Sequence, residues 1–229
     1  MNERINFNPT TLNIFTDASV KQMMYGFDSC SGIIAIIGDH KLAEQIKINR
    51  NTTNNFGELY AIQMAVQLAF DAKRLLKQSP KYINIFSDSL ISVRGLREWY
   101  NGWGINEEHE VERIVANKEI IARIISMIID YEINISLFHI KGHVNFNKNS
   151  DIHKAIQKFY QHNKDTGEID FETMKLMLQC NDYVDNSTRN FLQQSENVPI
   201  TIRPIERLLM FSDQDLEKYR NLINPEYQK

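Results

Sequence analysis

Apolar residues follow two spacings along the chain, and together these spacings predict a sheet covered by helices. Short apolar runs bounded by turn residues favour strands, whereas apolar residues that recur every three or four positions favour helices. The expected strands are residues 11–17, 23–29 continued by 32–37, a weaker strand to about 48, 82–86 and 133–140. The expected helices are residues 54–76, 90–100, a long helix reaching about 128, 150–162, 170–179, 181–194 and 212–222.

The order of these elements indicates the fold class. Three strands joined by short turns come first, as in an antiparallel meander, and the strands 82–86 and 133–140 each follow helical segments. Strands separated by helices pair in parallel, so strands 11–17 and 82–86 are expected to be parallel neighbours. The pattern therefore predicts an α/β fold with a five-stranded mixed sheet and helices on both faces.

Acidic residues stand where apolar segments would not require them. Asp17 and Asp88 each end a strand, Glu58 lies in the first turn of the helix that starts near residue 54, and Asp185 lies on helix 181–194. Crowded carboxylates repel one another unless a cation joins them, and hard oxygen ligands suit Mg²⁺ or Mn²⁺. Two such ions could activate a water and stabilise the leaving oxygen of a phosphodiester. The alternative is that each acid is a solvated cap at the end of its element.

Six short motifs, in order along the chain, resemble those of the type 1 ribonuclease H family. Residues 16–19 (Thr-Asp-Ala-Ser) resemble the family's Asp-Gly-Ser, residues 53–59 (Thr-Asn-Asn-Phe-Gly-Glu-Leu) its Thr-Asn-Asn-x-x-Glu-Leu, and residues 87–89 (Ser-Asp-Ser) its Thr-Asp-Ser. The remaining three are Trp99 with Trp103 for the paired tryptophans, residues 140–143 (Ile-Lys-Gly-His) for Val-Lys-Gly-His, and residues 181–185 (Asn-Asp-Tyr-Val-Asp) for Asn-x-x-x-Asp, which begins the closing helix.

This resemblance implies a ribonuclease H-like fold and a metal-dependent endonuclease that hydrolyses the RNA strand of RNA–DNA hybrids, leaving 5′-phosphates. Asp17, Glu58, Asp88 and Asp185 would be the catalytic acids and would bind two Mg²⁺ ions, with Mn²⁺ as a substitute. His143 would assist from a flexible loop, by proton transfer or by hastening product release. Its alternative is a plain histidine on a surface loop.

Other matched positions would contact the hybrid. Asn54 and Asn55 would lie at its minor groove, where a 2′-hydroxyl distinguishes RNA from DNA. Both asparagines are also candidates for capping the helix that starts there, and the two roles can coexist. Ser19, Ser89 and Asn181 are the further substrate-binding candidates that the resemblance implies.

The chain departs from the family in two regions. Residues 104–110 are acidic where the family often has a basic protrusion. Acids repel phosphates, so this difference predicts weak hybrid binding through the region. The alternative is a solvated helix start, where acids interact favourably with the helix dipole. The family places its last acid about ten residues after its histidine, whereas residues 144–184 lie between His143 and Asp185. A helical insertion is therefore expected at about 144–180.

The insertion has a basic and aromatic character, given by Lys148, His153, Lys154, Lys158, Phe159, Tyr160, His162 and Lys164. One hypothesis is that it grips the hybrid through its cations and by base stacking. The alternative is a surface helical hairpin packed on the sheet edge. A zinc site from His153, His162 and Cys180 would match no established ligand spacing.

Composition sets the remaining expectations. The resemblance covers about residues 10–194 of the 229, so it implies a catalytic domain there and a C-terminal extension at 195–229. The net charge of −3 gives no overall basic footprint for nucleic acid. Two cysteines and no apolar leader favour a reducing compartment, so we expect a cytoplasmic location, no membrane association and a monomer.

Two other functions fit the same pattern. A binding module could keep the fold without activity, although it would not need four retained acids. A DNA nuclease of the same fold would share Asp17 and Asp88 but would lack the Asn-Asn and Lys-Gly-His elements.

Overall fold

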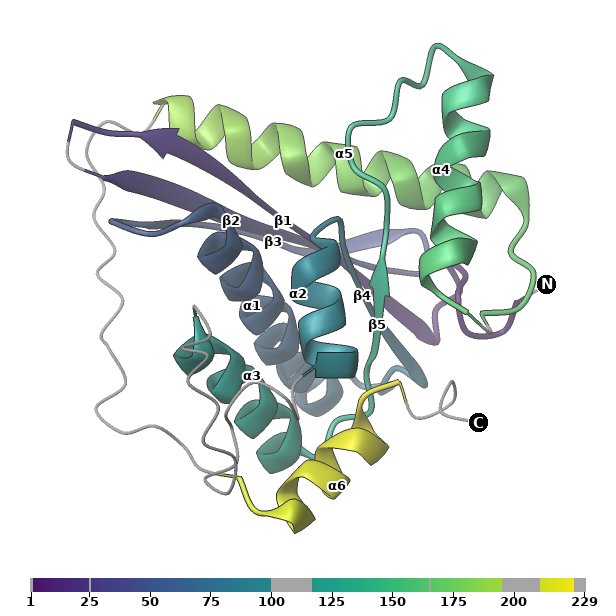
Figure 1. The fold of residues 1–229 in the computed structure, drawn as a ribbon. Helices are drawn as coiled ribbons and strands as arrows, with labels where there is room; N and C mark the ends of the chain where they lie inside the picture. The colour runs from purple at the N-terminus through teal and green to yellow at the C-terminus, as the bar shows by residue number, and fades with distance from the viewer. Residues whose placement is uncertain (1, 25, 100–116, 165, 195–210, 225–229) are drawn as a thin grey trace.

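The computed structural model describes residues 2–24, 26–99, 117–164, 166–194 and 211–224 (Figure 1). Its five-stranded sheet has the order β3-β2-β1-β4-β5. Pairing is antiparallel for β1–β2 and β2–β3 and parallel for β1–β4 and β4–β5, so the predicted mixed sheet is confirmed. The strands are β1 Thr11–Gln22, β2 Phe27–Ile37, β3 His40–Asn49, β4 Tyr82–Ser87 and β5 Ser136–His139.

Helices cover both faces of the sheet. They are α1 Asn54–Leu75, α2 Leu90–Arg94 continued by the π-helix Gly95–Trp99, α3 Lys118–Tyr131, α4 Asn149–His162, α5 Phe171–Gln194 and α6 Asp213–Leu222. Buried residues of α1, α3 and α6 share one apolar cluster, and those of α4 and α5 share another. Figure 1 shows α5 running across the sheet on the face opposite α1.

Alternation along β1 separates the two apolar layers. Leu12 and Ile14 belong to the α1 layer, and Phe15, the residue after Ile14, belongs to the α5 layer. This follows because successive strand side chains point to opposite faces of a sheet. In the α5 layer the rings of Phe15, Phe86 and Phe138 stack across three strands, with centroid separations of 4.9 and 5.4 Å.

Several predicted boundaries are wrong. β1 runs on to Gln22, β2 is continuous rather than broken, and β5 is shorter than residues 133–140. The cap of α1 is Thr53, whose hydroxyl accepts from the Phe56 N–H at 3.2 Å, and not Asn54 or Asn55. Glu58 consequently lies beyond the first helical turn, which contains no acid.

The predicted helices 170–179 and 181–194 are one helix, α5. Its buried positions include Met177, Asn181, Val184 and Thr188, which recur at helical spacing straight through the expected break. Nothing in this stretch interrupts a helix, because glycine and proline are absent from it. The helix lies close against β2, where a Cβ on Gly32 would collide with the Thr188 methyl group.

The helix α6 packs against the α1 layer through Leu216 and Tyr219. Ser212 and Asp215 form a capping box at the start of α6. After α6, Ile223 forms a parallel bridge with Ile135 beside β5. Within the described part of the chain, no helix is long and apolar enough to cross a membrane. Three further expectations fall outside the described residues: Trp103, the acidic stretch 104–110 and the start of the long helix.

Candidate active site

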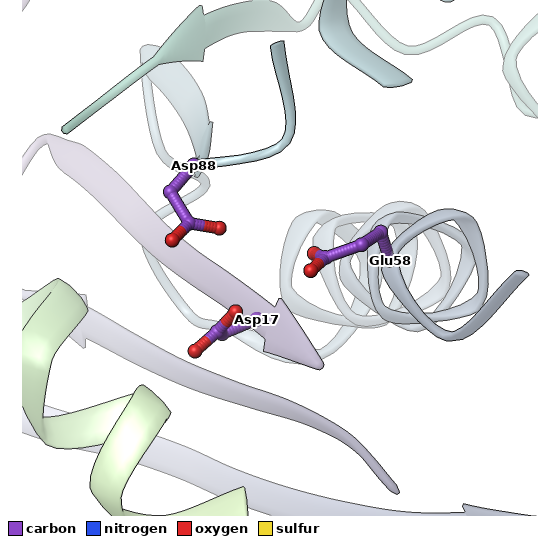
Figure 2. A group of neighbouring side chains, drawn as sticks. All are labelled: Asp17, Glu58 and Asp88. Carbon is purple, nitrogen blue, oxygen red and sulfur yellow. The ribbon is translucent and has the colours of Figure 1, made fainter. Parts of the chain in front are cut away.

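Three carboxylates from separate elements converge at one end of the sheet. Asp17 lies on β1, Asp88 directly follows β4, and Glu58 projects from α1 toward both (Figure 2). Each residue offers an oxygen, and these oxygens all lie within 4.8 Å of one another. The register places Asp17 and Asp88 together, because Thr16 of β1 pairs in parallel with Ser87 of β4.

Burial and mutual repulsion disfavour ionisation of this group. Burial, with the charges of Asp88 and Asp185, raises the pKa of Asp17 to about 9. Burial, with the charges of Asp17 and Asp88, raises the pKa of Glu58 well above its ordinary value. The pKa of Asp88 is also raised by burial, although His143 opposes this increase. Without a cation, the three carboxylates cannot all be charged at neutral pH.

The group has the properties of a site for a hard divalent cation. Its donors are carboxylate oxygens, which suit Mg²⁺ or Mn²⁺. The Glu58 Oε2 atom is buried without a hydrogen-bond partner among the described residues, and a cation would satisfy it. The described residues contain no other group of three acidic, histidine or cysteine ligands this close, so His153, His162 and Cys180 form no zinc site.

Asp185 reaches the same site from α5, where it is paired with Arg189 and contacts His143. Its carboxylate oxygens lie 2.6 and 2.7 Å from Nη2 of Arg189, one turn further along the helix. The His143 Nδ1 atom lies 3.2 Å from Asp185 Oδ2. Asp185 therefore adds to the charge around Asp17 without joining the close group of Asp17, Glu58 and Asp88.

The loop after β5 is pressed against Asp88. Gly142 lies so close to the Asp88 carboxylate that a Cβ at residue 142 would collide with its Oδ2 atom. His143, the next residue, has a left-handed backbone with φ 53° and a side chain that is 66% exposed. The loop thus presents the imidazole to solvent at the edge of the acidic group.

A cavity of about 520 Å³ opens over the acids. It is lined by Asp17, Ala18, Ser19, Val20, Asn54, Glu58, Asp88, Ser89, His143, Asp185 and Arg189. All five residues expected to be catalytic are in this lining. Arg189 is also in it, and sequence reasoning missed it, although its place four residues after Asp185 on a helix was a usable signal.

Of the five residues expected to bind substrate, three line the cavity and two do not. Ser19, Asn54 and Ser89 line the cavity, and Asn54 Nδ2 lies 3.4 Å from Glu58 Oε1. Asn55 is exposed outside the lining. Asn181 is 1% exposed on α5, and its side-chain amide has no partner among the described residues. Direct contact between Asn181 and a substrate would require α5 to move.

The insertion packs against the edge of the sheet, and some of its aromatic side chains are buried there. Phe159 is fully buried, and the Tyr160 hydroxyl is hydrogen-bonded to both backbone groups of Ile169. The Phe159 ring is therefore not free for the base stacking that we hypothesised. Asn163 follows α4 and bonds both the N–H and the carbonyl of His139, at 3.0 and 2.7 Å, which ties the insertion to β5.

Comparison with known proteins identifies a family. Residues 9–159 match the family model described as RNase H. Among solved structures, the chain is similar to LC11-RNase H1 from compost, crystallised with an RNA/DNA hybrid, at 21% identity, 64% coverage of this chain, 97% of that chain and a TM-score of 0.43. It is also similar to the foamy viral protease-reverse transcriptase in complex with dsDNA, at 16% identity, 66% and 94% coverage and a TM-score of 0.47. No match was found among curated proteins.

The family match contains Asp17, Glu58, Asp88 and His143 and ends before α5, so Asp185 and Arg189 lie beyond it. The similarities to solved structures are remote, and the assignment depends on the family match. Because that match spans more than half of the 229 residues, the chain belongs to the RNase H family of hydrolases.

Proposed function

We propose that this protein is an endonuclease that hydrolyses the RNA strand of RNA–DNA hybrids with divalent metal ions, leaving 5′-phosphate ends. The observation that carries the proposal is the convergence of Asp17, Glu58 and Asp88 in an open cavity of about 520 Å³, in a member of the RNase H family. The LC11-RNase H1 structure was determined with an RNA/DNA hybrid, which agrees with this substrate class.

The acids would be the metal ligands in the proposed reaction. Asp17, Glu58 and Asp88 would hold two Mg²⁺ ions, or Mn²⁺ in their place, and Asp185 would join them. The bound ions would supply Lewis-acid stabilisation of the attacking and leaving oxygens of the phosphodiester. The acids must lose their protons to bind a cation, so the raised pKa of Asp17 couples metal binding to proton release.

Residues around the acids would orient the hybrid and move protons. Asn54 stands at the cavity wall beside Glu58, where it would contact the 2′-hydroxyl that distinguishes RNA from DNA. Ser19 and Ser89 line the same cavity and would contact the sugar–phosphate backbone. His143 is exposed beside Asp185 and would carry a proton to the departing oxygen or hasten product release.

Cleavage of three duplexes of one sequence tests this function. A labelled RNA–DNA hybrid, a double-stranded DNA and a double-stranded RNA would be incubated with the protein in Mg²⁺ and in Mn²⁺. We expect cutting of the hybrid's RNA strand alone, with products that a 5′-phosphate-dependent exonuclease degrades. Cutting of the DNA duplex would indicate a DNA nuclease, and metal-dependent binding without cutting would indicate a binding module.

A further inference from the structure

We propose that Arg189 is a switchable cation of this site: it neutralises Asp185 when no metal is bound, and it contacts a backbone phosphate of the duplex when metal is bound. This inference deepens the proposed function and depends on a metal site at the carboxylates. It concerns a residue on α5, outside the family match.

Arg189 uses only one of its three guanidinium nitrogens to contact Asp185. Only Nη2 contacts Asp185, through both carboxylate oxygens at 2.7 and 2.6 Å. The guanidinium group also carries Nε and Nη1 donors, which have no hydrogen-bond partner among the described residues. The Arg189 side chain is 47% exposed and lines the cavity, whereas Asp185 is 7% exposed. Once the guanidinium group leaves Asp185, these donors and Nη2 together can contact an anion that enters the cavity.

The charges of the site explain why the contact would exchange. Asp17, Glu58, Asp88 and Asp185 line one cavity, and Arg189 is the strong cation in that lining. A divalent ion among the acids attracts the Asp185 carboxylate and repels a guanidinium nearby. Asp185 then exchanges Arg189 for the ion, and Arg189 is left with its full set of donors at the mouth of the cavity.

A released arginine has one chemical partner in this setting. The planar guanidinium group pairs with phosphate through two parallel N–H···O bonds. A duplex whose scissile bond lies over the acids brings its neighbouring phosphates to the same mouth. The same residue thus opposes metal binding in the empty site and supports duplex binding in the loaded one, so its removal has effects of opposite sign.

The first measurement is metal affinity of the free protein by calorimetric titration with Mg²⁺ and with Ca²⁺. For Arg189→Met we expect affinity to rise about tenfold, because a positive charge beside a divalent ion is lost. Arg189→Lys keeps the charge and is expected to bind metal within about twofold of the parent protein. Melting temperature is recorded for each variant, and a damaged fold would lower metal affinity rather than raise it.

The second measurement is duplex affinity in Ca²⁺ and in EDTA across a salt series, with strand integrity checked on a gel. In Ca²⁺ we expect Arg189→Met to weaken hybrid binding about fivefold and to reduce the salt slope by about one phosphate contact. In EDTA the variant should bind like the parent protein, since Arg189 then remains on Asp185. Arg220→Met serves as the matched control, because Arg220 pairs with Glu217 on α6 at 3.0 Å.

The proposal is overturned if Arg189→Met leaves metal affinity unchanged or lowers it, or if duplex affinity falls equally in Ca²⁺ and EDTA. Neither result depends on catalysis. If the parent protein binds metal and duplexes but cuts none of them, the proposed function fails while the two Arg189 measurements still decide this inference.

Discussion

At the scale of single residues, Asp17 is a buried acid that the fold stabilises only when it is protonated or bound to a cation. Its pKa is raised to about 9 in the folded chain, against 3.8 for the ordinary side chain. The folded state therefore binds this proton more tightly than the unfolded state. The stabilisation is complete below pH 3.8 and is lost as pH rises through about 9.

The first prediction concerns this pH dependence. In EDTA, we expect the melting temperature of the parent protein to fall between neutral pH and pH 9. Mg²⁺ should reverse the fall, and Asp17→Asn should flatten it because the buried ionisation is removed. Thermal melts across this range, followed by circular dichroism, provide the measurement. A parent protein whose melting temperature in EDTA rises toward pH 9 would contradict the assigned environment of Asp17.

The second prediction concerns Gly142. Alanine at this position would press on the Asp88 carboxylate and shift it out of the acidic group. We expect Gly142→Ala to lower kcat on the hybrid about a hundredfold, since small misplacements of catalytic groups have effects of that size. The melting temperature should change by only a few degrees. Unchanged turnover would mean that the loop does not set the position of Asp88.

Most of the acids at the site could be predicted from the sequence, because an acid at the end of an apolar strand has a cost that structure alone does not explain. Asp17 and Asp88 stand out for that reason and Glu58 through the motif that it shares with the family, and the structure brings all three together. Arg189 could not be selected in the same way. Its spacing of four residues from Asp185 indicates an ion pair on a helix, but only the position of α5 shows that this pair lines the cavity.

At the scale of elements, α5 is the least predictable part of the site. The resemblance placed the start of the closing helix at Asn181, and this expectation divided a helix that the apolar spacing would have kept whole. The resemblance assigned the fourth acid to Asp185 alone, although another acid follows His143 more closely in the chain. Asp151 on α4 lies near the family's usual distance, whereas Asp185 is separated from His143 by the whole insertion.

The third prediction separates these two acids. Asp185 lines the cavity and Asp151 does not, although Asp151 lies inside the family match and Asp185 outside it. We expect Asp185→Asn to lower hybrid cleavage by about 10–100-fold, as changes around metal sites do, and Asp151→Asn to leave it unchanged. Initial rates in Mg²⁺ provide the comparison. The reverse pattern would assign the fourth acid to α4.

At the scale of the whole molecule, the described residues after α5, which are 211–224, contribute to the core. Tyr219 of α6 is fully buried, and its hydroxyl donates to the Leu96 carbonyl at 2.7 Å. The Asn224 side chain accepts from the Leu137 N–H at 2.8 Å, beside β5. The division of the chain into a catalytic domain and an extension at residue 195 therefore remains a prediction, and these contacts argue that the described part of the extension is needed for stability.

The fourth prediction measures that contribution. We expect Tyr219→Ala to reduce the free energy of unfolding by about 3–5 kcal/mol, through the cavity that it leaves between α6 and the α1 layer. Tyr219→Phe keeps the ring and removes the hydroxyl, so the expected loss is about 1 kcal/mol. Urea denaturation of both variants gives the values. Equal, small losses would mean that α6 is not part of the folded core.

In the proposed function, the carboxylates of Asp17, Glu58 and Asp88 bind the metal ions that the protein needs to hydrolyse the RNA strand of a hybrid. The most direct test of this assignment is the initial rate of hybrid cleavage in Mg²⁺ for Asp88→Asn beside the parent protein. We predict active parent protein and a loss of at least about a hundredfold in the variant, whose melting temperature in EDTA stays at or above that of the parent. A variant that cuts the hybrid as fast as the parent protein would contradict the assignment of Asp88 and its neighbouring acids to the catalytic metal site.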